Sequence, residues 1–330
     1  MSPRSRVRGR RRSALIAASV TTLSLTASGC VVVHGEREVL PAATRAEAAQ
    51  ALRQFTSAYN KADEAYDSSL DADYVTGALA DIDKARLTAG RANNPGGNPS
   101  HTPLELTDAE FAIPKKAGWP RWFVADAEGN KGGSARWLLV FTRDSLDEPW
   151  QVSFLTLVAA GKVPEFRTDA DGWAEPVAAG SDGLAVSPDE LSKEYTTYLK
   201  DGEDTFEPGT HTTEWRAKRE KNATRPGLAT QYIDEPLTNG DYAPVALRTA
   251  DGGAAVFFAT RHFERQTAAP GTSVPAPNDS VLALTKGEIK QSLTMEFVSN
   301  QLVLDPARGS GEQRVRVLGR IQGLTAAQGE

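Results

Sequence analysis

Two titratable side chains on stretches that favour strands could transfer a proton, His262 and Asp126. His262 is flanked by Phe258 and Phe263, and Asp126 ends a different apolar stretch. A histidine with an ordinary pKa near ~6.5 can accept a proton at neutral pH. In the structural alternative, His262 is a solvent-facing or hydrogen-bonded strand residue, and Asp126 caps the turn at 128–130. The structural alternative is favoured for both, so the sequence alone assigns no catalytic residue.

Motifs for catalysis, cofactors and metals are missing. The sequence has no nucleophile elbow, P-loop, dinucleotide fingerprint, zinc-protease helix or paired CxxC. One cysteine and four scattered histidines give no basis for a Cys/His metal centre. The acidic residues of one stretch are Asp63, Glu64, Asp67, Asp71, Asp73, Asp81 and Asp83. Their spacing does not match an EF-hand loop, so a solvated acidic surface is expected there, with no metal and no cofactor; adventitious calcium binding is the alternative.

The amino-terminal segment is basic and then apolar. Six arginines precede Ser13, no acidic residue occurs before Glu36, and an apolar run extends over residues 14–27. A run of about 14 residues is too short for a helix that spans a ~30 Å hydrocarbon core. A basic segment, a short apolar run and small residues are typical of a secretory signal peptide, expected here at residues 1–29. The pair at 11–12 leaves general secretory and twin-arginine export both open.

The one cysteine of the chain, Cys30, follows Ala27, Ser28 and Gly29. This sequence resembles a bacterial lipobox, with Ala27 where leucine or valine is commoner. The resemblance implies cleavage between Gly29 and Cys30, diacylation of the Cys30 thiol, and a lipidated tether at 30–43. Two acyl chains meet the condition for stable anchoring, here at the outer face of the cell membrane. The alternative is a free thiol beside an uncleaved signal anchor.

The predicted signal peptide and the rest of the chain carry net charges of opposite sign. The first 29 residues carry +6, whereas the remainder holds 31 basic and 43 acidic residues, a net −12. Nucleic-acid binding requires phosphate neutralisation, so the acidic remainder argues against it and against general attraction to anionic lipid. One basic group ends a predicted helix, where the helix dipole favours cations. Its members are Lys218, Arg219, Lys221 and Arg225.

The first half of the remainder predicts two helices followed by strands. A capping box at 44–47 and a 4,3,4,3,4 apolar spacing predict a helix of about 22 residues, and a second helix is expected to stop at Gly90. Strands are predicted at 122–125, 136–143 and 150–158, with a hairpin loop at 126–134. In the last strand, period two places Trp150, Val152, Phe154 and Val158 on one face. Trp119, in a turn between glycine and proline, is expected to be exposed.

The second half predicts the same order. A capping box at 187–190 precedes one helix, a second helix is expected at 213–221, and four strands follow. The strands are predicted at 242–247, 254–263, 293–304 and 314–321. Gly-Gly and Thr-Arg pairs recur in both halves, which suggests an internal repeat; two unrelated α+β domains are the alternative.

Helices followed by a curved antiparallel sheet resemble the NTF2-like, cystatin-related fold, in the order of elements only. The resemblance implies an α+β fold class with two tandem domains and, in NTF2-like enzymes, a cone pocket with an Asp or His base. It would make His262 or Asp126 that base. The leader and anchor together resemble secreted lipoproteins of GC-rich Gram-positive bacteria. The expected segments are a signal peptide at 1–29, a tether at 30–43, domains at 44–170 and 187–330, and a linker at 171–186.

These observations favour a membrane-anchored envelope lipoprotein that binds a protein partner or a small ligand without catalysis. The ligand would occupy a sheet face or the cleft between domains. The enzyme alternative is an isomerase, lyase or hydrolase that uses the Asp or His base. An importer's substrate-binding lipoprotein is ranked last, because the sequence lacks the βαβ alternation of its lobes.

Overall fold

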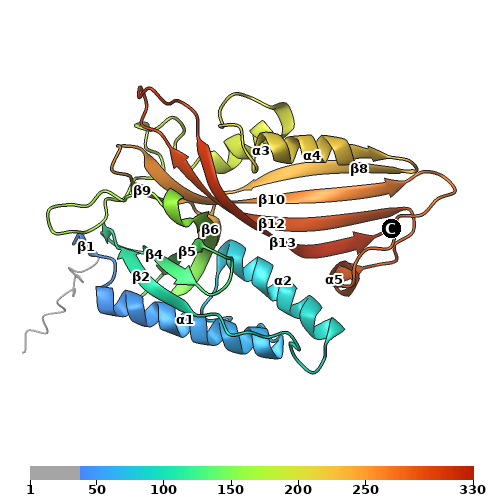
Figure 1. Cartoon of the computed structure of the whole chain (residues 1–330), viewed down its shortest axis with the longest axis horizontal. Coiled ribbons are helices and arrows are strands. Elements are labelled where there is room, and N and C mark those ends of the chain that lie inside the picture. Colours follow the sequence, from blue (N-terminus) through green and yellow to red (C-terminus); the bar gives the residue numbers. More distant parts are fainter. Residues whose placement is uncertain (1–37) are drawn as a thin grey trace, which may run out of the picture. The chain divides into compact units, whose positions relative to one another are not determined.

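The computed structural model describes residues 38–330, and residues 35–330 form one compact unit. Figure 1 shows its helices and strands. The predicted signal peptide and the sites predicted at Gly29 and Cys30 lie outside the described residues. Across residues 38–330, none of the helices has the length and apolar character needed to cross a membrane.

The first half of the described chain contains two helices followed by an antiparallel sheet, as the sequence predicts. The sheet has four strands in the order β2-β4-β5-β6. A separate two-stranded pair joins β1 to β3. The elements are β1 (Leu40–Pro41), α1 (Arg45–Ala65), α2 (Gly77–Asn93), β2 (Leu106–Ala112), β3 (Lys115–Lys116), β4 (Arg121–Gly129), β5 (Ala135–Arg143) and β6 (Gln151–Ala159).

The capping box that begins α1 is confirmed. The Glu47 amide donates to Thr44 Oγ1 at 3.1 Å, and the Thr44 amide donates to the Glu47 carboxylate at 2.7 Å. The predicted end of α2 at Gly90 is wrong, because that helix continues to Asn93. A Cβ at Gly90 would lie 2.5 Å from the Tyr66 ring. Gly90 therefore allows that ring to approach the helix and does not end it.

The prediction that β6 buries one continuous face is also wrong. Trp150 and Val152 belong to the core beneath α1, whereas Phe154 and Val158 belong to the core on the opposite face of the sheet. A register shift at Ser153, where successive β5 residues pair with Val152 and Phe154, causes this change. A β-bulge adds one residue and so reverses the faces of the residues that follow it.

The second half again contains two helices followed by a larger sheet. Its strands follow the order β11-β13-β12-β10-β8-β7, and β9 pairs with β10. The helices are α3 (Leu191–Asp201), α4 (Thr213–Ala223) and α5 (Asp279–Leu284). The strands are β7 (Thr224–Arg225), β8 (Leu228–Leu237), β9 (Val245–Arg248), β10 (Ala254–Ala268), β11 (Thr285–Lys286), β12 (Ser292–Asp305) and β13 (Arg316–Gly329). Short 3-10 turns occur at Ala160–Lys162 and Gly240–Tyr242.

The second predicted capping box does not form. α3 begins at Leu191, and its N-cap, Glu190, makes no side-chain capping hydrogen bond. The Glu190 amide donates to the Ser187 carbonyl at 3.0 Å, which closes a turn before the helix. The Glu190 carboxylate accepts from Lys193 at 2.9 Å, so it is engaged along the helix and does not reach back to Ser187.

The sequence pattern does not predict β2 or β8, and the strand that it predicts at 122–125 is shorter than the observed β4. β8 lies near one edge of its sheet, where only the two residues of β7 pair with its outer side. Side chains of β8 alternate between half-buried and exposed, with no fully apolar face. β4 continues to Gly129, so the predicted hairpin loop at 126–134 starts too early and Asp126 lies within the strand.

Three buried layers separate the helices and sheets. Phe55 of α1 packs on Phe141 of the first sheet, with ring centroids 6.1 Å apart. The opposite face of that sheet contributes Phe154, which lies 6.4 Å from Phe257 of the second sheet in a shared core. α3 covers the other face of the second sheet through Tyr195. Figure 1 shows α2 and the pair α3 and α4 on opposite sides of the larger sheet.

The predicted linker at 171–186 is held by backbone hydrogen bonds to both halves. The amide of Ala174 donates to the Ile113 carbonyl at 3.0 Å, and that of Val177 donates to the Ala246 carbonyl at 2.9 Å. The arrangement of helices and antiparallel sheets confirms the α+β fold class. The domain boundaries stay a prediction.

Candidate functional site

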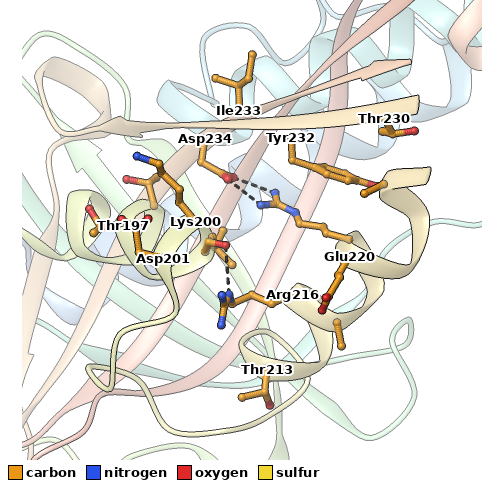
Figure 2. A pocket seen from close by; sticks show the side chains of 15 residues that line it. Thr197, Lys200, Asp201, Thr213, Arg216, Glu220, Thr230, Tyr232, Ile233 and Asp234 are labelled. Carbon is orange, nitrogen blue, oxygen red and sulfur yellow. Dashed lines mark hydrogen bonds and ion pairs between the residues drawn. The ribbon is translucent and has the colours of Figure 1, made fainter. Parts of the chain in front are cut away.

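A groove between α3, α4 and β8 has a volume of about 910 Å³. Figure 2 shows Tyr232 and Asp234 of β8 pointing towards the helices and Ile233 pointing to the other side of the strand. This alternation follows from the two-residue period of a strand. The four-residue spacing of Arg216 and Glu220 places both on the groove face of α4. The volume is within the ~300–1,000 Å³ range of small-molecule pockets.

A buried ion pair forms one wall of the groove. Arg219 of α4 donates two hydrogen bonds to the Asp234 carboxylate, at 2.7 and 2.9 Å. The two side chains are only 7% and 9% exposed. The guanidinium also lies 5.0 Å from the ring centroids of Tyr232 and Trp215. Charges removed from water need such partners, and the fork geometry fixes the orientation of both groups.

Four further charged side chains line the groove, two of each sign: Lys200, Asp201, Arg216 and Glu220. None of them lies within 4.0 Å of an oppositely charged group among residues 38–330. Arg216 Nε instead donates to the Leu199 carbonyl at 3.3 Å, and its guanidinium lies 5.5 Å from the Tyr198 ring centroid. Hydroxyl groups add donors and acceptors from Thr196, Thr197, Thr213 and Thr230. The groove therefore offers fixed and free charges beside neutral hydrogen-bonding groups.

His262 lies beneath this site and is not one of the groove-lining residues. Its side chain is 3% exposed and stacks on Phe297, with ring centroids 4.9 Å apart and an interplanar angle of 8°. The Trp215 ring lies edge-on at 6.1 Å, and Glu264 Oε1 lies 3.5 Å from His262 Nε2. Burial lowers the pKa of His262, opposed by Glu264, so the neutral imidazole is favoured. His262 is therefore not solvent-facing, and its buried Nε2 has no hydrogen-bond partner among residues 38–330; the ring is held by packing between Trp215 and Phe297.

Asp126 lies on the first sheet, away from His262. Its carboxylate accepts from Arg136 Nε at 2.6 Å. Burial raises the pKa of Asp126, and the guanidinium opposes that shift. The residue lines a separate cavity of about 740 Å³ together with Glu110 and Phe111. The structure therefore does not bring His262 and Asp126 together into one site.

The ion pair of the groove is the feature that the sequence pattern misses. The sequence pattern attributes the basic end of α4 to the helix dipole, whereas the structure buries one of its members, Arg219, to 6% exposure. Its partner Asp234 belongs to β8, which the pattern does not indicate. The alternation of Thr230, Tyr232 and Asp234 towards one side is the signal that could have located that wall.

The predicted solvated acidic surface is wrong for three of its residues. Asp63, Asp71 and Asp83 are 6%, 1% and 3% exposed. Arg86 bridges Asp63 and Asp83, which explains why two of these carboxylates tolerate burial. His101 Nδ1 lies 2.8 Å from Asp63 Oδ2. Among residues 38–330, no group of three or more His, Cys, Asp or Glu side chains could hold a metal ion.

A family model described as a domain of unknown function (DUF8094) matches residues 39–329, which include both sheets. The chain belongs to this family. It is similar to an uncharacterised lipoprotein of Streptomyces coelicolor, with 73% identity over 319 residues, 97% of this chain and 96% of that protein.

Two further relatives cover the same length. An uncharacterised lipoprotein of Streptomyces avermitilis is 61% identical over 97% of this chain and 96% of its own length. A second uncharacterised lipoprotein of S. coelicolor is 23% identical over 98% of this chain and 97% of its own length. Relatives named as lipoproteins thus match nearly the whole chain at identities from 23% to 73%. No solved structure matches the chain.

Proposed function

We propose that this protein is a membrane-anchored envelope lipoprotein that binds a small zwitterionic ligand, such as an amino acid or short peptide, in the groove between α3, α4 and β8. The observation that carries the proposal is the set of four charged side chains without ion-pair partners in one concave site. Lys200 and Arg216 would hold a carboxylate, and Asp201 and Glu220 would hold an ammonium group. A ligand with both charges satisfies both pairs at once.

The buried pair Arg219–Asp234 gives this groove a rigid wall. Because the two charges pair with each other, neither Arg219 nor Asp234 is free to bind a charged group of the ligand. The Tyr232 ring, stacked against the Arg219 guanidinium, adds a flat apolar surface beside the charges. Preorganised walls of this kind reduce the ordering entropy that a ligand must overcome.

The groove is tested by replacing Lys200 with alanine. Titration of glycylglycine into the protein by calorimetry should show binding that Lys200→Ala weakens at least about tenfold, equivalent to ~1.4 kcal/mol. Lys193→Ala, on the same helix but paired with Glu190 outside the groove, is the matched control and should bind as the wild type does. Equal affinity in all three proteins, or no binding of glycylglycine and free amino acids, would contradict the proposal.

The anchor is proposed at Cys30, supported by the lipobox and by the three relatives, which are named as lipoproteins. Cys30→Ser removes the thiol that accepts the lipid, so most of the protein should leave the membrane fraction or accumulate as an uncleaved precursor. Fractionation followed by intact mass spectrometry measures both outcomes. Ser28→Ala keeps a small residue before the cysteine and should leave anchoring unchanged. Full membrane retention of Cys30→Ser at the mature mass would refute the anchor.

The tandem arrangement, with domains at 44–170 and 187–330, and the NTF2-like resemblance also belong to this proposal. The repeated order of two helices and then an antiparallel sheet supports both. The enzyme alternative, with His262 or Asp126 as the base, is not favoured by any contact described above. His262 is packed between Trp215 and Phe297, and Asp126 is bound to Arg136.

A further inference from the structure

Three cations gather where β4 begins and β5 ends. Arg121 and Arg143 are directly opposite each other in the β4–β5 pairing. Like charges at such positions repel and destabilise a strand pair. Lys116 lies close by, and its Nζ donates to the Pro120 carbonyl at 2.7 Å. A repulsive arrangement of this kind needs a compensating group.

Aromatic rings hold the two guanidinium groups in place. Arg121 lies 5.0 Å and Arg143 lies 5.5 Å from the Trp119 ring centroid, and Arg143 also lies 4.6 Å from that of Trp150. The expectation that Trp119 is exposed is wrong, because these contacts leave it half-buried. Stacking orients the guanidinium groups but does not neutralise their charge.

No acidic side chain of the described chain comes within 4.0 Å of any of these three cations. The Nε atoms of Arg121 and Arg143 are buried and have no hydrogen-bond acceptor. Burial and the field of Arg121 lower the pKa of both Lys116 and Arg143. The nearby Glu47 opposes the shift at Arg143, and its carboxylate keeps its negative charge while it accepts from the Thr44 amide, so one carboxylate stands against three cations. The cluster therefore has an excess of positive charge.

Two of these cations, Lys116 and Arg143, but not Arg121, line a cavity of about 670 Å³ that lies between the two halves of the chain and is distinct from the α3–α4 groove. Trp122 and Val245 contribute apolar surface from opposite halves. Two acidic residues also reach the cavity. Asp241 accepts a hydrogen bond from Thr76 at 2.7 Å, and Asp144 is exposed at the surface.

We propose that this cavity binds a small organic anion, with its carboxylate or phosphate between Lys116 and Arg143 and its apolar part against Trp122. An oxyanion there accepts hydrogen bonds from the Arg143 guanidinium and the Lys116 ammonium group and offsets the positive charge of these two side chains. The apolar part gains from leaving water in contact with the indole and the neighbouring aliphatic side chains. This site is independent of the groove proposed above, because the two share no lining residue.

The test uses the mature lipoprotein in phosphatidylcholine nanodiscs, titrated by calorimetry with hexanoate and hexyl phosphate. At least one of these anions should bind, and hexylammonium, of equal chain length and opposite charge, should not. Inorganic phosphate should bind at least tenfold more weakly than hexyl phosphate. Nanodiscs with phosphatidylglycerol distinguish the sources: lost hexyl phosphate binding identifies a lipid headgroup, unchanged binding identifies a free anion, and both results support the site.

Arg143→Gln should weaken anion binding at least tenfold and leave the melting temperature unchanged or higher, because it removes one of two opposed like charges. Lys116→Gln provides a second variant if Arg143→Gln folds poorly. Arg53→Gln, at an exposed position on α1, is the matched control and should bind as the wild type does. Two results would overturn the proposal: anions that bind no better than hexylammonium, or equal affinity in the wild type and both cavity variants.

Discussion

Asp234→Ala is expected to lower the free energy of unfolding by about 3–5 kcal/mol, the range for breaking a buried ion pair. The substitution leaves the Arg219 guanidinium at 7% exposure without its two hydrogen bonds to carboxylate. Arg219 Nε already lacks a partner, so the variant would bury a charge with no described acceptor on any of its nitrogens. Urea denaturation followed by circular dichroism measures the loss.

The double replacement Arg219→Met/Asp234→Leu separates the burial of charge from the packing of the side chains. Because it removes both charges and retains apolar volume, its stability should lie within about 1–2 kcal/mol of the wild type or exceed it. Asp201→Ala, in the same groove but exposed, should change stability by no more than ~0.5 kcal/mol. A loss below ~1 kcal/mol for Asp234→Ala would mean that the pair is solvated and not a fixed wall.

The second large effect is expected at Asp71, as a change in the pH dependence of stability. Burial and the adjacent Asp83 carboxylate raise the pKa of Asp71 to about 8 in the folded protein, from 3.8 in an unperturbed aspartate. The folded state therefore retains a proton that the unfolded chain releases near pH 4, so the free energy of unfolding falls as the pH rises from about 4 to 8. Asp71→Asn should remove this slope and be more stable by roughly 2–4 kcal/mol at pH 7.

Thermal denaturation of wild type and Asp71→Asn at several pH values between 4 and 9 measures the difference. Asp305, whose pKa burial raises to about 7, contributes a similar slope in both proteins and cancels in the comparison. Asp73→Asn removes an exposed carboxylate two residues away and should preserve the wild-type slope. Parallel curves for wild type and Asp71→Asn would show that no proton is held by Asp71.

Local signals predicted the first helix and the strand cores well. The reciprocal hydrogen bonds of Thr44 and Glu47 need only residues within one turn, so a four-residue motif suffices to locate the start of α1. The motif at 187–190 has the same residue types, but a neighbouring lysine, Lys193, competes for the Glu190 carboxylate. A capping pattern is therefore informative only when its acidic side chain has no closer cation.

The candidate sites depend on contacts that sequence spacing does not encode. Arg219 and Asp234 face each other because β8 lies beneath α4, and β8 has too many polar residues for its period to be recognised. The net charge of −12 on residues 30–330 likewise argues against anion binding as a whole. The net charge does not reveal the local excess of positive charge where Arg121 and Arg143 lie opposite each other in the β4–β5 pair. His262 and Asp126 were recognised by residue type, which says nothing about their packing.

Because of the bulge at Ser153, a change in the length of β6 should disturb its packing more than a change in its residue types. Trp150 and Val152 serve one interior, while Phe154 and Val158 serve the other, because a single extra residue lies between them. Deleting Ser153 would restore an uninterrupted pleat and turn one of these aromatic and aliphatic pairs away from its core. Conservative exchanges along β6 should thus be absorbed by repacking, whereas the loss of one small residue would disturb two interiors at once.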